Sequence, residues 1–95
     1  MLTIDSYPVP RPTVQGRLLE NEAVVVLPEK GQVKVLNEVG ARIWSLADGS
    51  RSVRDIAAMI STEFAVTPAE AEADTLAFIA TLAAKDLVSL STQRL

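Results

Sequence analysis

The stretch VKVLNEVGARIWSLADGSRSVRDI, residues 33–56, changes its hydrophobic period part-way along. Its first residues alternate between apolar and polar side chains, as expected of a half-buried strand. After Asn37 the apolar residues recur at the spacing of an amphipathic helix. A short strand that leads directly into helical sequence predicts a small domain of mixed α and β structure.

Three β-rich segments lie at or before the start of this stretch. Residues 13–20 form a weak strand pattern in which Gly16 indicates a bulge or a close approach. Ala23–Leu27 is a continuous apolar run typical of a central strand, and Gln32–Leu36 alternates. Residues 28–31, PEKG, suit a turn between them. We expect an antiparallel meander in sequence order, with the most apolar strand in the middle.

Two helices follow, and both carry terminal signals. Asn37 is placed to cap the first helix, and Asp48 with Gly49 is placed to end it. Ser52 is the expected cap of the second helix, with Asp55 in the position of a capping-box acid. The chain between residues 37 and 64 therefore predicts two short helices joined by a tight loop.

A third helix has the clearest start signal. Thr67 is followed by Pro68 at the first helical position and by Glu70, and the pattern runs to about Lys85. Residues 87–91 form either a last short strand or the tail. The fold class we predict is α+β, resembling a winged helix-turn-helix, with a three-stranded antiparallel sheet followed by three α-helices.

The domain boundaries follow from composition. Residues 1–12 contain Pro8, Pro10 and Pro12, which favour an extended N-terminal arm, as a mobile tail or as a segment that docks on a partner. Residues 13–91 form the single predicted domain, and residues 92–95 form a tail.

The composition also excludes several classes of function. The chain has no cysteine and no histidine, which removes thiolate nucleophiles, sulfur-ligated metals and the usual general base. A net charge of −3 disfavours nucleic-acid binding, which depends on neutralising phosphates. The sequence lacks the ~20-residue apolar run of a membrane span and the features of a signal peptide. We expect a cytoplasmic protein that binds no membrane and contains no catalytic residue, metal ion or cofactor.

One flank of the third helix is apolar where a solvent-facing flank should be polar. Core positions are expected at Ala71, Thr75, Phe78 and Leu82, and the polar flank at Asp74, Thr81 and Lys85. The unexplained flank consists of Glu72, Leu76, Ile79, Ala80 and Ala83. It is covered by the sheet or the arm, or it is one wall of a groove for a partner peptide.

The third strand offers an open edge. The first edge of the meander is blunted by neighbouring prolines and by Gly16, whereas Gln32–Leu36 contains neither residue type. Lys34 at its centre is either a protective charge or a contact. A partner could therefore add a strand along Gln32, Val33, Lys34, Val35 and Leu36. The same edge could pair two copies, which leaves a monomer or a weak homodimer open.

Residues 35–57, VLNEVGARIWSLADGSRSVRDIA, and residues 71–88, AEADTLAFIATLAAKDLV, together resemble the PqqD-like proteins. The resemblance covers roughly residues 15–90 and departs from the family pattern at two positions. Thr75 stands where a branched apolar residue is common, and Asp86 stands where a glycine is common.

The resemblance implies a peptide-recognition domain that binds the leader of a ribosomally made precursor peptide. It implies that the leader adds between the third strand and the third helix and is then presented to a modifying enzyme, such as a radical SAM protein, a cyclase or a protease. We therefore expect a non-catalytic adaptor. The expected peptide-binding residues are Gln32, Val33, Lys34, Val35, Leu36, Glu72, Leu76, Ile79, Ala80 and Ala83.

Two alternatives belong to other classes of protein. A small winged-helix DNA-binding regulator would share the helix arrangement, although the acidic start of the third helix would repel phosphate. An acyl carrier protein would share the size and acidity, with Ser52 as the nearest match to its modified serine.

Overall fold

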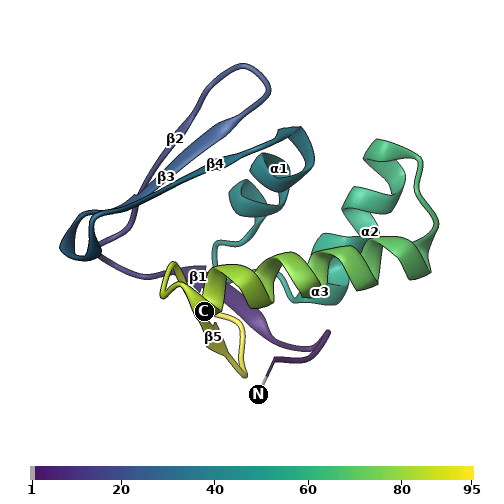
Figure 1. Ribbon diagram of the computed structural model, residues 1–95. Coiled ribbons are helices and arrows are strands. Elements are labelled where there is room, and N and C mark those ends of the chain that lie inside the picture. Colours follow the sequence, from purple (N-terminus) through teal and green to yellow (C-terminus); the bar gives the residue numbers. More distant parts are fainter. Residues whose placement is uncertain (1) are drawn as a thin grey trace.

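The computed structural model describes residues 2–95 and has the predicted α+β architecture (Figure 1). The elements in chain order are β1 (Tyr7–Pro10), β2 (Gln15–Leu18), β3 (Ala23–Leu27), the 3₁₀ turn η1 (Pro28–Lys30), β4 (Gln32–Leu36), α1 (Glu38–Leu46), α2 (Val53–Phe64), α3 (Pro68–Ala84) and β5 (Val88–Ser91). The prediction of a three-stranded antiparallel sheet followed by three helices is confirmed.

The sheet β2–β3–β4 has the predicted order, with the apolar strand β3 in the centre. Alternate residues of β3 are buried, and they pair in register with Gln32, Lys34 and Leu36 of β4. These three β4 residues therefore share the inner face of the sheet. Val33 and Val35 are 65 % and 61 % exposed, because they lie on the outer face, which no element covers among residues 2–95.

The hydrophobic core lies between the inner face of the sheet and the helices. Val25, Ile56, Ile79 and Leu82 are all fully buried within it, and they come from β3, α2 and α3. No helix among residues 2–95 combines the length and the apolar character needed to cross a bilayer.

The predicted helix starts are confirmed by their cap geometry. The Asn37 side chain accepts a hydrogen bond from the Gly40 N–H at 2.9 Å. Ser52 and Asp55 form a reciprocal capping box, and the Thr67 hydroxyl accepts from the Glu70 N–H. Each cap satisfies backbone donors that the first helical turn leaves unpaired, so the starts of α1, α2 and α3 are fixed locally.

Residues 2–12 of the N-terminal arm contribute a strand and backbone contacts to the fold. β1 pairs antiparallel with β5, in a second, two-stranded sheet. The carbonyls of Ser6 and Ile4 accept hydrogen bonds from the N–H groups of Val53 and Arg54, at 2.9 and 2.8 Å. The arm thus satisfies donors at the start of α2, and residues 87–91 belong largely to a strand because β1 supplies its partner.

Gly16 allows the Trp44 ring to approach β2 closely and does not form a bulge. The β2–β3 register is continuous, with Gly16 opposite Val25. A Cβ at residue 16 would lie 2.7 Å from the Trp44 Nε1 atom, which is closer than real Cβ contacts. Glycine at this position therefore lets the Trp44 ring pack directly beneath β2.

The two departures from the family pattern have different structural outcomes. Asp86 adopts a left-handed conformation, φ +60°, in the turn between α3 and β5. An L-residue adopts this region at some cost, and Asp tolerates it better than most residues. Thr75 is 0 % exposed, and its hydroxyl has no hydrogen-bond partner among residues 2–95. Burying an unpaired hydroxyl is unfavourable, so Thr75 is a weak point in the core.

We predict that Thr75→Val increases the free energy of unfolding by about 1–2 kcal/mol, because it replaces an unpaired buried hydroxyl with a methyl group of similar size. Urea denaturation followed by circular dichroism measures this change. Thr81→Val is the matched control, since the Thr81 hydroxyl donates to the Ala77 carbonyl and is exposed. A Thr75→Val protein no more stable than the parent would contradict the assignment.

Candidate functional site

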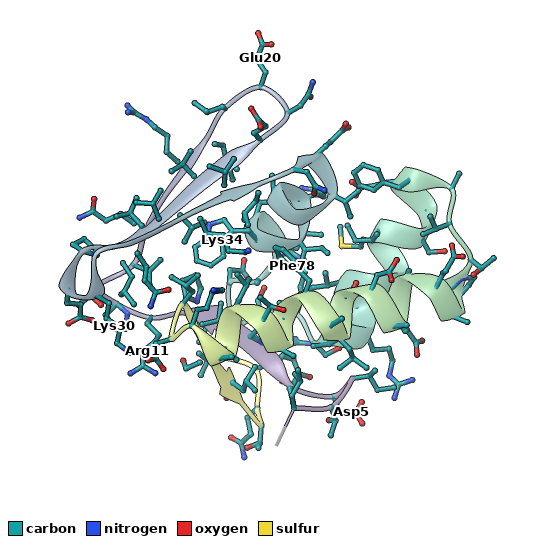
Figure 2. All side chains as sticks on the ribbon, in the orientation of Figure 1. Asp5, Arg11, Glu20, Lys30, Lys34 and Phe78 are labelled. Carbon is teal, nitrogen blue, oxygen red and sulfur yellow. The ribbon has the colours of Figure 1, made fainter. Side chains whose placement is uncertain are left out.

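A groove lies between the free edge of β4 and helix α3, where two hollows share Lys34 as a lining residue. Figure 2 shows the side chains of Lys34 and Phe78 in the space between these elements. Two adjoining hollows of about 450 and 540 Å³ make up the groove, and Lys34 lines both. The first is lined by Lys34, Val35, Leu36, Asn37, Val39, Gly40, Ile43, Asp74 and Phe78, and the second by Gly31, Gln32, Val33, Lys34, Ala84 and Lys85. We call the whole feature the β4–α3 groove.

The floor of the groove is apolar at the Leu36 end. Leu36 and Ile43 are both 2 % exposed and belong to the hydrophobic core, while Val39 and Phe78 pack against it. Gly40 makes room for the Phe78 ring, because a Cβ there would lie 3.0 Å from its Cζ atom. The floor is therefore a surface of the core itself, with a partly exposed aromatic ring at its centre.

Charges are separated along the groove. Asp74 lies at the Leu36 end, Lys34 in the middle and Lys85 at the Gln32 end. None of these three side chains forms an ion pair within the described part of the chain. The groove thus presents one acidic end and one basic end to anything that enters it.

An ion pair connects the two walls of the groove next to its basic end. Lys30, in the turn before β4, bonds to Asp86 in the turn after α3. The hydrogen bond from Lys30 is the main reason that the pKa of Asp86 lies below its usual range. The positive charge of Lys30 lowers this pKa further. This contact ties together the two elements that form the walls of the groove.

The structure brings together only half of the predicted binding residues. All five β4 residues, Gln32, Val33, Lys34, Val35 and Leu36, line the groove. The predicted α3 residues Glu72, Leu76, Ile79, Ala80 and Ala83 do not line either of its hollows.

The α3 residues that were predicted lie elsewhere. Glu72 lines a separate hollow with residues of α2. Ile79 is fully buried, Leu76 and Ala83 pack against the core, and Ala80 is exposed. The face of α3 that turns toward β4 instead carries Asp74, Phe78 and Ala84, and Lys85 follows as the C-cap of the helix.

The sequence reasoning missed this face because it assumed that the groove wall would be the more apolar flank. Helical spacing identifies two flanks beside the core stripe, but the packing of α3 against the rest of the domain decides which one faces β4. Asp74, Phe78 and Lys85 recur at helical spacing. This spacing was the sequence pattern that could have indicated that the three side chains share one face.

The groove contains the parts needed to bind an extended chain. β4 is an edge strand, so one side of its main chain is open to a further strand. Within residues 2–95 no group of three His, Cys, Asp or Glu side chains is placed to hold a metal ion. The arrangement fits strand addition, in which main-chain bonds align a peptide and the floor holds a side chain.

Comparisons with known proteins agree with this geometry. The family model described as coenzyme PQQ synthesis protein D (PqqD) matches residues 22–88. No curated protein matches the chain.

Three solved structures are similar to this chain. TbiB1 in complex with the TbiA(beta) leader peptide is 28 % identical, with a TM-score of 0.79, covering 85 % of this chain and 94 % of that chain. The PqqD truncation of Methylobacterium extorquens PqqCD, described as a stand-alone recognition element for ribosomally synthesised and post-translationally modified peptides, is 27 % identical, with a TM-score of 0.77 and coverages of 94 % and 95 %. Lasso peptide synthetase B1, complexed with the leader peptide, is 22 % identical, with a TM-score of 0.79. The match covers 87 % of this chain and 98 % of that chain, and it shows the fold alone.

We predict that Lys30→Ala raises the pKa of Asp86 toward the ordinary value of about 4. Because the folded-state pKa is lowered, the pair stabilises the fold above the unfolded pKa, and this stabilisation is lost as the pH falls through the folded pKa. A carbon-detected NMR titration of the carboxyl groups measures the shift. Arg54→Ala, which breaks a separate pair with Asp5, should leave Asp86 unchanged. An unaltered Asp86 titration in the Lys30 variant would rule out the contact.

Proposed function

The chain belongs to the PqqD family, and from that membership we propose that it is a non-catalytic adaptor for a ribosomally synthesised precursor peptide. It captures the leader segment of the precursor in the β4–α3 groove and delivers it to a modifying enzyme. The observation that carries the proposal is the open edge of β4 beside an apolar floor. Two proteins of the same fold have been solved with leader peptides.

The leader adds as a fourth strand, antiparallel to β4. Its main chain bonds to the side of β4 that β3 leaves open, which supplies affinity without dependence on sequence. Alternate leader side chains then point toward α3, and one of them rests on Phe78 and the surrounding floor. Val33 and Val35 lie on the outer face and contact the strand through its other side chains.

The expected affinity is moderate. Each Leu-sized side chain buried on the floor contributes about 1.5–3 kcal/mol. Ordering a disordered leader opposes binding, so only part of the gross interaction energy remains. Dissociation constants in the micromolar to sub-micromolar range follow, and these suit a peptide that must later be released to an enzyme.

The enzyme that receives the leader is proposed to be a radical SAM protein, a cyclase or a protease. The adaptor itself supplies no reacting group to that chemistry. We place the complex in the cytoplasm, where ribosomal precursors are made. This assignment follows from the proposed substrate.

The two rival functions fit the geometry less well. An acyl carrier protein must present its serine for modification, whereas Ser52 is 6 % exposed and its hydroxyl caps α2. A DNA-binding regulator would need cations along α3, whose first half carries Glu70, Glu72 and Asp74.

An NMR titration tests the function directly. The ligand is the leader peptide of a precursor encoded beside this protein's gene. We expect the amide signals of Lys34, Val35 and Phe78 to shift on binding, together with slowed hydrogen exchange along β4, because its open donors become paired. Shifts confined to α2 or to β1 and β5 would place the binding surface elsewhere.

We predict that Phe78→Ala weakens leader binding by at least about tenfold, because it removes most of the apolar contact on the floor. Isothermal titration calorimetry measures the loss. Leu76→Ala is the matched control, since Leu76 is also a partly buried residue of α3 but lies outside the groove. Equal losses in the two folded variants would contradict the proposed position of the leader.

A further inference from the structure

We infer that the β4–α3 groove selects leaders by the order of their charges: a basic residue, then a large apolar residue, then an acidic residue two positions after the apolar one. This inference rests on the proposed function and names the class of peptide that the same groove prefers. It is carried by the separation of Asp74 from Lys85, which line different hollows, with Lys34 lining both.

The positions of the charges relative to the apolar floor give the order. Leu36 and Phe78 lie in the hollow that also contains Asp74. Lys34 lies at the boundary of the two hollows, and Lys85 lies in the second one, which has no carboxylate in its lining. A bound strand therefore passes from a negative wall, across the apolar floor, to a positive wall.

The register of β4 gives the spacing. Leu36, Lys34 and Gln32 share the inner face of the sheet, at intervals of two residues. A strand added to β4 has the same period, so the leader side chain over the floor and the one opposite Lys34 are also two residues apart. Both point toward α3, where Phe78 and Lys85 meet them.

The direction of the added strand gives the order in the leader sequence. β4 runs from Gln32 at the basic end to Leu36 at the Asp74 end. An antiparallel leader enters at the Leu36 end and leaves at the Gln32 end. Its apolar anchor therefore precedes its acidic residue, and a basic residue near Asp74 precedes the anchor.

The three groove charges make this preference large enough to measure. Asp74, Lys34 and Lys85 have no ion-pair partner within residues 2–95, so a leader charge does not have to displace an internal one. Exposed pairs are individually weak. Exchanging the two leader charges, however, turns attraction into repulsion at both ends, and we expect about a tenfold difference in affinity at low salt.

The test begins with a library of random 12-residue peptides displayed on phage and selected on the intact protein. Selected peptides that lose binding to the folded Phe78→Ala variant are taken as groove-dependent. We expect these peptides to be enriched in the order basic, apolar, any residue, acidic. A synthetic peptide from this set and its charge-exchanged version are then compared by fluorescence polarisation at low and high salt.

A charge-reversal variant provides the sharper comparison. In Lys34→Glu combined with Lys85→Glu, both ends of the groove are acidic, so the preference between the two peptides should be lost. The control is Arg17→Glu combined with Arg94→Glu, which makes the same change in net charge outside the groove and should preserve the preference. Circular dichroism checks that each variant is folded.

The outcomes separate the two proposals. Groove-dependent peptides without a charge order, or with the opposite order, would overturn this inference and leave the leader-binding function in place. Failure to select any groove-dependent peptide would overturn both. Equal affinity of the charge-exchanged peptides for the parent protein would also overturn the inference.

Discussion

The site depends on one constraint: β4 is held by β3 on one side, and no strand among residues 2–95 pairs with its other side. Every backbone N–H and C=O group on the open side must bond to water or to an incoming chain. The surrounding elements keep that side accessible. α1 begins immediately after β4 at the Asn37 cap, and Gly40 leaves room for Phe78 beside the edge. The edge is therefore a defined feature of the fold, with its own floor and walls.

The groove floor is also the surface of the core, and this has an energetic consequence. Leu36 and Ile43 are almost fully buried without a ligand, so their positions are already determined by folding. A peptide that binds there orders itself but does not need to reorganise the protein. Lys30 and Asp86 connect the turns at one end of the two walls.

The sequence predicted those features that depend on neighbours along the chain. Helix starts at Asn37, Ser52 and Thr67 were predictable because a cap involves only the next three residues. The meander was predictable because the period of β4 and the apolar run of β3 are local patterns. The docking of the arm on α2 was not predictable, because the Val53 N–H donates to the carbonyl of Ser6, which is far away in the sequence.

The flank of α3 that faces β4 was also beyond the local patterns. Phe78 was expected in the core and is instead partly exposed over Gly40, a contact between helices that are distant in sequence. Apolar character indicated Leu76 and Ala83, yet these residues serve the packing of α3. Polar residues such as Asp74 gave no sign from composition that they line a groove.

Gly49 brings the two ends of the domain to one place. Its N–H donates to the Pro8 carbonyl, and its own carbonyl accepts from the Leu95 N–H. Figure 1 shows both chain ends below α3, with β4 above it. A linker attached at either end would therefore leave the groove unobstructed. Joining such a linker to an enzyme would convert an encounter in solution into an intramolecular one, at an effective concentration of ~1 mM.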